Sequence, residues 1–118
     1  SNICSNESLM ALFVTIYMSV MGKEGVKEAA KMSFDGAHYL HDQLLETGRF
    51  EERYNQPFFN EFCLRYKGDV DSLQKRFIEN GIMGGIKVEA DTIMFAVTEK
   101  RTKEEIHRLV NIVKEEQL

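Results

Sequence analysis

A long apolar run near the amino end constrains this chain more than any other feature. Residues 9–21 are apolar apart from one threonine and one serine. Ser5 or Asn6 can cap a helix here and Gly22 can end it, so the pattern predicts a helix over residues 6–21. Such a helix is apolar all round and belongs against other protein. Each large side chain left in water loses roughly 1.5–3 kcal/mol of the stabilisation that its burial would give.

The length of 118 residues predicts a single domain, which is too small to surround such a helix. The helix therefore indicates a missing domain, a partner subunit or self-association. We expect the chain to be a piece of a longer protein, in which residues 1–22 link the domain to the rest. The run is too short to cross a bilayer and has no basic segment before it, so we predict no membrane partner and no signal peptide.

Charge and cysteine content narrow the function classes. The formal net charge is −4, and the basic cluster at residues 100–103 is followed at once by Glu104 and Glu105. The sequence contains no basic stripe, so nucleic-acid binding is not predicted. Cys4 and Cys63 match no metal or redox spacing and could pair only if the fold brought them together. Two buried thiols in a reducing compartment are the favoured interpretation, which predicts a cytoplasmic protein.

Six further elements follow from periodicity and capping residues. The expected helices cover residues 24–46, 70–80 and 102–116, and the expected strands cover residues 58–66, 86–89 and 92–98. The first strand should pair with the third through a crossover, and the second and third should form a hairpin. The chain is therefore predicted to be an α+β domain. Two N-terminal helices precede β-α-β-β-α, with helices on one face of a small antiparallel sheet.

Helical spacing also predicts which side chains face the core. The expected core positions are Val26, Ala30, Phe34, Ala37, Leu40, His41, Leu44, Leu45, Leu73, Phe77, Ile78, Ile106, Leu109, Val110 and Val113. The last helix begins with a capping box formed by residues 102–105.

Two histidines and a glycine-rich run are candidates for binding chemistry. His38 and His41 would share one helix face, a spacing that can bind a metal ion. No nearby cysteine or carboxylate completes a ligand set, so we favour a helix rim with one imidazole partly buried and predict no metal. Residues 81–85 are glycine-rich but follow a helix and precede a strand, whereas a phosphate cradle precedes a helix. A helix end leading into a strand is the favoured interpretation.

Asn60 and Glu61 interrupt the aromatic strand over residues 58–66. They could face solvent by alternation or hydrogen-bond across a domain interface, and both alternatives stay open. A Glu without a neighbouring His or second acid is a weak candidate for acid–base work, and no Ser/His/Asp or Cys/His set stands out. The residues alone thus predict no catalytic and no cofactor-binding residue.

Six stretches occur in order and at plausible spacing along the chain. They are SNICSN at residues 1–6, GKEG at 22–25, AHY at 37–39, PFFNEF at 57–62, GIMGG at 81–85 and VTEKRTKEEI at 97–106. Together they resemble the P-protein family of the glycine cleavage system, in the C-terminal part of its split bacterial form, glycine dehydrogenase (decarboxylating) subunit 1. The resemblance covers essentially the whole chain.

The resemblance implies a pyridoxal-phosphate (PLP) enzyme of fold type I, with a large cofactor-binding domain and a smaller C-terminal α+β domain that this chain would supply. It implies an oligomeric oxidoreductase that decarboxylates glycine and passes the aminomethyl group to the lipoyl H-protein. In the split enzyme the PLP-binding lysine belongs to glycine dehydrogenase subunit 2. The resemblance therefore implies that PLP is bound through that partner, with no cofactor in this chain.

Related aminotransferases hold the substrate carboxylate with an arginine on a small-domain strand, but residues 92–98 include none. No catalytic residue is therefore carried over. Asn60, Glu61, Thr98 and Glu99 match family motifs and are predicted to be interface positions. The apolar helix also supports an alternative, a stand-alone interaction or regulatory module that dimerises through it. Both hypotheses predict that the isolated chain self-associates.

Overall fold

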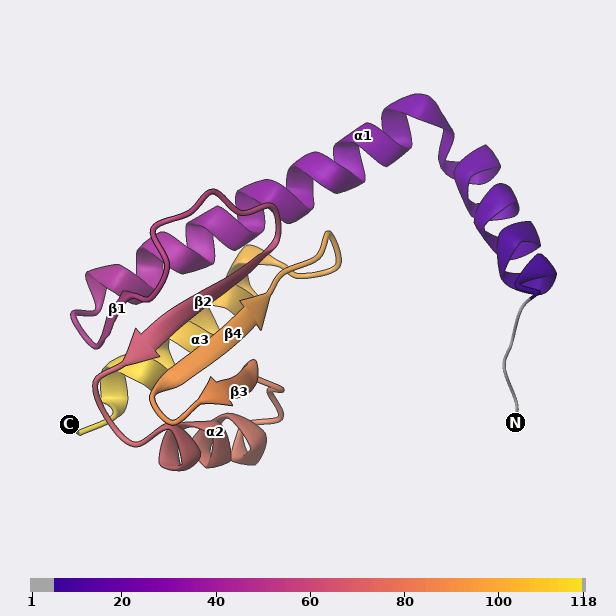
Figure 1. The fold of residues 1–118 in the computed structure, drawn as a ribbon. Helices are drawn as coiled ribbons and strands as arrows, with labels where there is room; N and C mark the ends of the chain where they lie inside the picture. The colour runs from indigo at the N-terminus through magenta and orange to yellow at the C-terminus, as the bar shows by residue number, and fades with distance from the viewer. Residues whose placement is uncertain (1–5, 118) are drawn as a thin grey trace.

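The computed structural model describes residues 6–117, which form a four-stranded antiparallel sheet with helices on one face (Figure 1). The elements in chain order are α1 (Ser8–Glu46), β1 (Phe50–Glu52), β2 (Glu61–Tyr66), α2 (Val70–Glu79), β3 (Ile86–Glu89), β4 (Thr92–Ala96) and α3 (Lys103–Glu115). This order confirms the predicted α+β class and the β-α-β-β-α succession. The short strand β1 is an addition to it.

The sheet has the strand order β1-β2-β4-β3, and all three neighbouring pairs are antiparallel. β2 therefore pairs with β4 through a crossover that contains α2, while β3 and β4 form a hairpin. Both pairings agree with the sequence prediction. The sequence does not reveal β1, because three residues are too few to show alternation. Its Phe50 lies opposite Tyr66 at the edge of the sheet.

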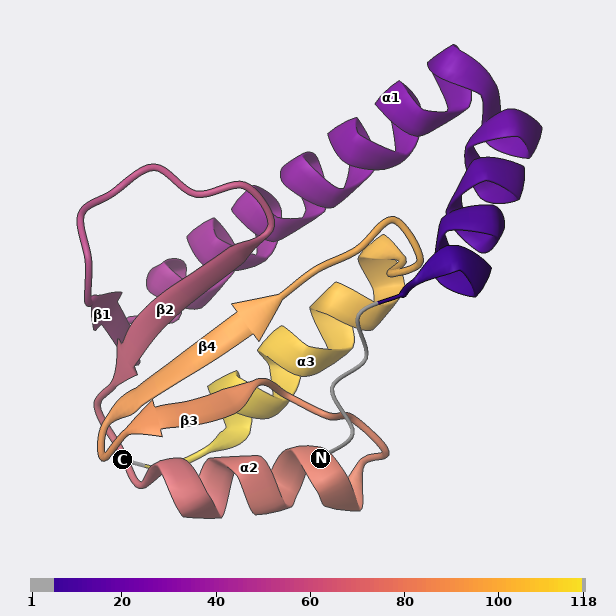
Figure 2. The same cartoon turned by 45° about the vertical axis from the view of Figure 1, so that its right-hand side comes forward.

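One face of the sheet carries the hydrophobic core. Phe62 lies opposite Phe95, Leu64 lies opposite Ile93, and all four side chains are buried. α1 and α3 pack together on this face, and α2 packs beside α3 (Figure 2). On the other face, alternate residues such as Cys63 are only half-buried. The helices therefore cover one face, as predicted.

α1 consists of two helices joined by a kink at Gly22, whose φ of 68° and ψ of 173° lie outside the helical region. This backbone conformation is essentially restricted to glycine. The kink turns residues 8–21 away from the sheet, so that this segment projects from the body of the domain (Figure 1). The predicted helix end at Gly22 is confirmed, and a second helix begins directly after it.

The projecting segment, residues 8–21, is not covered by the described chain. Leu9 is 76% exposed and Val20 is 81% exposed. The Cα radius of gyration is 17.1 Å, larger than the roughly 13.5 Å of a compact chain of this length. By length and composition alone α1 could cross a membrane. The part before the kink is nevertheless only roughly 21 Å long, against roughly 30 Å of hydrocarbon core.

Several expected core positions on α1 and α2 are wrong. Val26, Ala30 and Phe34 are not buried, because burial on α1 begins only at Ser33. Ile78 is 69% exposed, since α2 directs Phe77 inward and the next residue lies about 100° further round the helix. The positions predicted for α3 are all buried.

The N-cap predicted for the apolar helix is wrong, because α1 has Glu7 at this position with no side-chain cap, although Asn6 Oδ1 accepts a 3.0 Å hydrogen bond from the Ser8 amide, and Ser5 lies outside the described residues. The other predicted helix ends agree with the structure. Thr102 caps α3 in a capping box with Glu105. Gly81 follows α2 with a φ of 73°, and the Ile82 amide donates a 2.8 Å hydrogen bond to the carbonyl of Phe77. This confirms that residues 81–85 end a helix and lead into β3. β2 begins later than predicted because Phe58 and Phe59 lie in the preceding loop.

The Gly22→Ala substitution should straighten α1. Among the described residues, no heavy atom beyond the neighbouring chain lies within 4 Å of the position that a Cβ would take at Gly22, so the cost is the backbone conformation itself, of order 1–3 kcal/mol. Spin labels at Thr15 and Lys31 should then move apart to roughly 24 Å, as expected for a continuous helix. An unchanged distance distribution would contradict the assignment of the kink to this glycine.

The Gly84→Ala substitution should destabilise the domain by about 1–3 kcal/mol. A Cβ at Gly84 would lie 2.0 Å from Cδ2 of Phe77, a fully buried side chain. Urea unfolding of Gly84→Ala, of Phe77→Leu and of the double variant measures the coupling. The double variant should recover part of the Gly84→Ala loss, and strictly additive changes would exclude the proposed clash.

Candidate interaction surface

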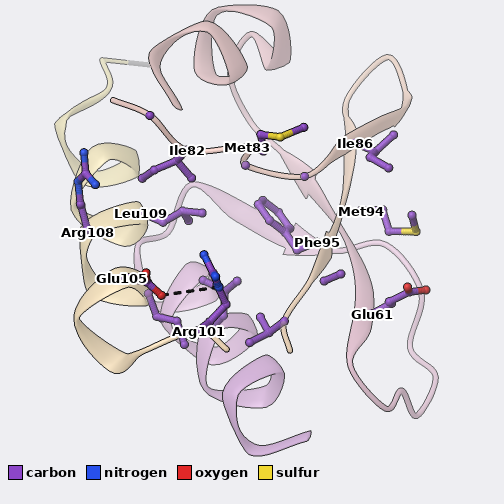
Figure 3. A pocket seen from close by; sticks show the side chains of 17 residues that line it. Glu61, Ile82, Met83, Ile86, Met94, Phe95, Arg101, Glu105, Arg108 and Leu109 are labelled. Atoms are coloured by element: carbon purple, nitrogen blue, oxygen red, sulfur yellow. Dashed lines mark ion pairs between the residues drawn. The ribbon is translucent and has the colours of Figure 1, made fainter. Parts of the chain in front are cut away.

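Two hollows flank the start of β2 and the end of β4. The first has a volume of about 580 Å³ and lies between α3, the loop over residues 81–85 and β4 (Figure 3). The second, of about 270 Å³, lies between α1, the loop between β1 and β2, and the uncovered sheet face. Glu61 and Met94 line both hollows, so the two form one continuous uneven surface.

The first hollow is apolar inside and charged at one rim. Ile82, Phe95 and Leu109 contribute to its lining (Figure 3). At the rim Arg101 Nε lies 3.7 Å from a carboxylate oxygen of Glu105. Because these charges balance each other, the hollow is suited to an apolar side chain rather than to a strongly charged ligand.

Beside this rim, Arg108 anchors α3 to the end of α2. Its guanidinium donates a hydrogen bond to the carbonyl of Asn80, the C-cap residue of α2. An arginine near a helix C-terminus satisfies a carbonyl that has no partner within the helix. Arg108 therefore has a structural contact that accounts for its position at the hollow.

In the second hollow His41 is held by two carboxylates. Its Nε2 lies 2.6 Å from an oxygen of Glu52, its Nδ1 lies 3.0 Å from Asp42 Oδ1, and its side chain is 12% exposed. His38 instead lies between two rings, with centroid distances of 3.9 Å to Phe34 and 4.0 Å to Phe58. The helix-rim interpretation with one largely buried imidazole therefore holds.

No metal site is assembled from these groups. Among residues 6–117, no group of three or more His, Cys, Asp or Glu side chains is placed to hold a metal ion. Burial raises the pKa of the Cys63 thiol, so at neutral pH it is protonated and a poor nucleophile. Cys63 is half-buried rather than buried, and Cys4 lies outside the described residues.

The four predicted interface positions lie at one end of the sheet. The Asn60 side chain donates a 3.2 Å hydrogen bond to the carbonyl of Val97, and the Val97 amide donates to the Asn60 carbonyl at 3.0 Å. Asn60 therefore joins β2 to the residue after β4. Thr98 and Glu99 follow in the adjoining turn, and Glu61 is exposed on the uncovered face. Their role at an interface stays a prediction.

The described residues do not fit PLP. The residues lining the two hollows include no lysine that could carry the cofactor. The loop at residues 81–85 follows the carbonyl end of α2, whereas a phosphate is bound by the amide end of a helix. The ring of Phe77 occupies the space beside Gly84. We therefore assign no cofactor contact to these residues.

The sequence interpretation misses the rim of the first hollow. Arg101 appears there only in the basic cluster, Glu105 as an acid that follows this cluster and belongs to the capping box, and Leu109 only as a core position. The spacing of four residues between Glu105 and Leu109 is a usable signal, because such residues share one face of a helix, whereas Arg101 precedes the helix. The opposite wall, from residues 82–86, comes from a distant part of the chain and has no local signature.

The comparisons with known proteins agree with this fold. The family model described as glycine cleavage system P-protein matches residues 1–113. The chain is 44% identical to the probable glycine dehydrogenase (decarboxylating) subunit 1 of Geobacillus kaustophilus (strain HTA426), covering 94% of this chain and 26% of that protein. It is 37% identical to the subunit so described in Chlorobaculum parvum (strain DSM 263 / NCIMB 8327), with the same shares covered.

A solved structure shares the fold at similar coverage. The crystal structure of glycine decarboxylase (P-protein) of the glycine cleavage system, in inhibitor-bound form, superposes with a TM-score of 0.85 and 34% sequence identity. The match covers 98% of this chain and 27% of that one. The chain thus spans about a quarter of the length of the relatives that it matches. It belongs to the glycine cleavage system P-protein family.

Proposed function

We propose that this chain is the C-terminal small domain of the non-lysine subunit of a two-subunit glycine decarboxylase. The observation that carries the proposal is the superposition on a glycine decarboxylase P-protein over 98% of the chain. The relatives described as subunit 1 support the assignment to that half of the enzyme. In this proposal the parent is a cytoplasmic PLP enzyme of fold type I.

The whole enzyme would decarboxylate glycine and transfer the aminomethyl group to the lipoyl H-protein. PLP would be bound through glycine dehydrogenase subunit 2, and it would supply the electron sink for decarboxylation. The contribution of this chain would be structural, because its hollows are apolar and its histidines are held in local contacts. We assign it no catalytic residue.

Residues 8–21 would link this domain to the remainder of the subunit. An apolar segment that projects beyond the domain and is exposed along its length needs a cover. The relatives are about four times as long as this chain, so they contain the protein that could supply it. A stand-alone module that dimerises through the same helix is the alternative, and it leaves the similarity to much longer enzymes unexplained.

A chimera tests the proposed function. This sequence would replace the matching segment of the Geobacillus kaustophilus subunit, and the chimera would be purified with subunit 2 and supplied with PLP and lipoyl H-protein. CO₂ release from carboxyl-labelled glycine should stay within about tenfold of the parental rate. A tenfold lower rate corresponds to an activation free energy that is about 1.4 kcal/mol higher.

The control is a chimera with Phe13→Glu, which places a charge on the apolar linking helix. It should lose assembly with the rest of the enzyme, and hence activity. A chimera that folds and binds subunit 2 but releases no CO₂ would contradict the proposal.

The isolated chain should self-associate through residues 8–21. Phe13 is 63% exposed in a segment with little polar surface, and association would bury it. Light scattering at increasing concentration should show species above the monomer mass, and Phe13→Glu should shift them toward monomer. Ala30→Glu adds the same charge to an exposed position beyond the kink and should have little effect. A monomer at all concentrations would refute the expected association.

A further inference from the structure

The uncovered face of the sheet has the composition of an interface. In an antiparallel sheet with one face in water, the outward positions are normally polar. Here Cys63 and Met94 lie opposite each other on β2 and β4, and Ile86 lies opposite Met94 on β3. Ala96, which lies opposite Glu61, is also apolar. The apolar strip crosses three strands and connects the two hollows.

The charged groups around this strip are already paired within the chain. The Glu52 carboxylate lies 2.6 Å from Nε2 of His41. The ion pairs are Arg65 with Asp91 at 3.0 Å, Arg53 with Glu89 at 3.0 Å, and Lys67 with Glu51 at 3.6 Å. These pairs neutralise the border of the strip, so they offer little net charge to a partner.

Glu61 is different from its neighbours. Its carboxylate lies within the apolar strip and is exposed, and in the described chain it has no ion pair and no hydrogen bond from its side chain. In Figure 3 it points away from the centre of the first hollow. In water such a carboxylate is well solvated. Under a covering protein it would need a cation, because burying an unpaired charge is very costly.

We propose that this face is covered by the remainder of the same subunit, which presents an apolar surface carrying one basic side chain that pairs with Glu61. The inference rests on the proposed function. The occupant follows from length, since about three-quarters of each relative lies outside the part that this chain matches. The basic side chain follows from charge complementarity, because among the described residues Glu61 places on this surface a charge that has no ion pair and no hydrogen bond.

Cys63 supplies a natural probe of the covered face. The chimera described above, without subunit 2, is treated with iodoacetamide, and alkylation of the peptide containing Cys63 is followed by mass spectrometry. The Asn111→Cys substitution on the exposed side of α3 provides a reference thiol in the same molecule. Because burial within the domain already raises the pKa of Cys63 and slows its reaction, the ratio of the Cys63 rate to the reference rate is also measured in this chain alone, carrying Phe13→Glu to limit self-association. This ratio should be at least about a hundredfold lower in the chimera, as expected for a thiol that reacts only through rare opening.

The Glu61→Lys variant tests the charge. Besides burial, the Glu61 carboxylate itself raises the pKa of the Cys63 thiol, so each variant is also measured in the chain alone, where only this direct effect acts. Beyond that effect, a lysine facing the proposed cation should weaken the contact and raise the alkylation rate of Cys63 in the chimera by about tenfold or more. Glu61→Gln, which keeps the shape, should give a smaller rise in the same direction. Glu104→Lys is the matched control, because Glu104 is exposed on α3 and has no ion pair among the described residues. It should leave the rate unchanged.

Two results would overturn the inference. If the ratio of the Cys63 rate to the reference rate is the same in the chimera as in the chain alone, the subunit does not cover this face. Slowing that appears only when subunit 2 is added would assign the face to that partner. If the Glu61 substitutions change the Cys63 rate by the same factor in the chimera as in the chain alone, no cation pairs with Glu61. Glycine decarboxylation measured on the same samples separates this inference from the proposed function. A chimera that is active although its Cys63 reacts freely would refute the covering of the sheet face but not the proposed function.

Discussion

The packing of α1 and α3 against a single face of the sheet determines the rest of this structure. Phe62, Leu64, Ile93 and Phe95 all point to that face, and their burial requires both helices. No helix in the described chain remains to cover the other face. α1 also continues beyond the sheet, so its first half has nothing among residues 6–117 to pack against. Two apolar surfaces left uncovered by the described residues are therefore consequences of one core.

Most of the fold could be predicted because its signals are local. The capping residue Thr102 and the glycines at 22 and 81 define where helices begin or end, and the structure uses each of them in that way. Strand pairing followed from connection lengths. The errors have a common cause: periodicity reveals which face of an element is apolar but not how far the neighbouring element extends. Phe34 lies on an apolar stripe of α1 that extends beyond the end of the sheet.

The candidate surface could be predicted only in part. Asn60 and Glu61 stood out as polar residues in an aromatic segment, yet the sequence could not separate their roles. The structure separates them by one step of strand alternation: the Asn60 side chain turns to the carbonyl of Val97, whereas Glu61 faces outward. The two hollows join residues far apart in the chain, such as Ile82 and Leu109. Such proximity depends on the packing of α3 across the sheet, which no local pattern records.

Gly22 determines how the projecting segment is placed relative to the domain. Its conformation fixes the direction in which residues 8–21 leave the domain, and among the described residues no atom beyond the neighbouring chain lies within 4 Å of the position of a Cβ there. A free helix pair would gain by becoming continuous, because one more turn of helix would satisfy backbone groups at the kink. In the proposed function, the remainder of the subunit would hold residues 8–21 in the direction that Gly22 sets, which would offset the free energy that a continuous helix would gain.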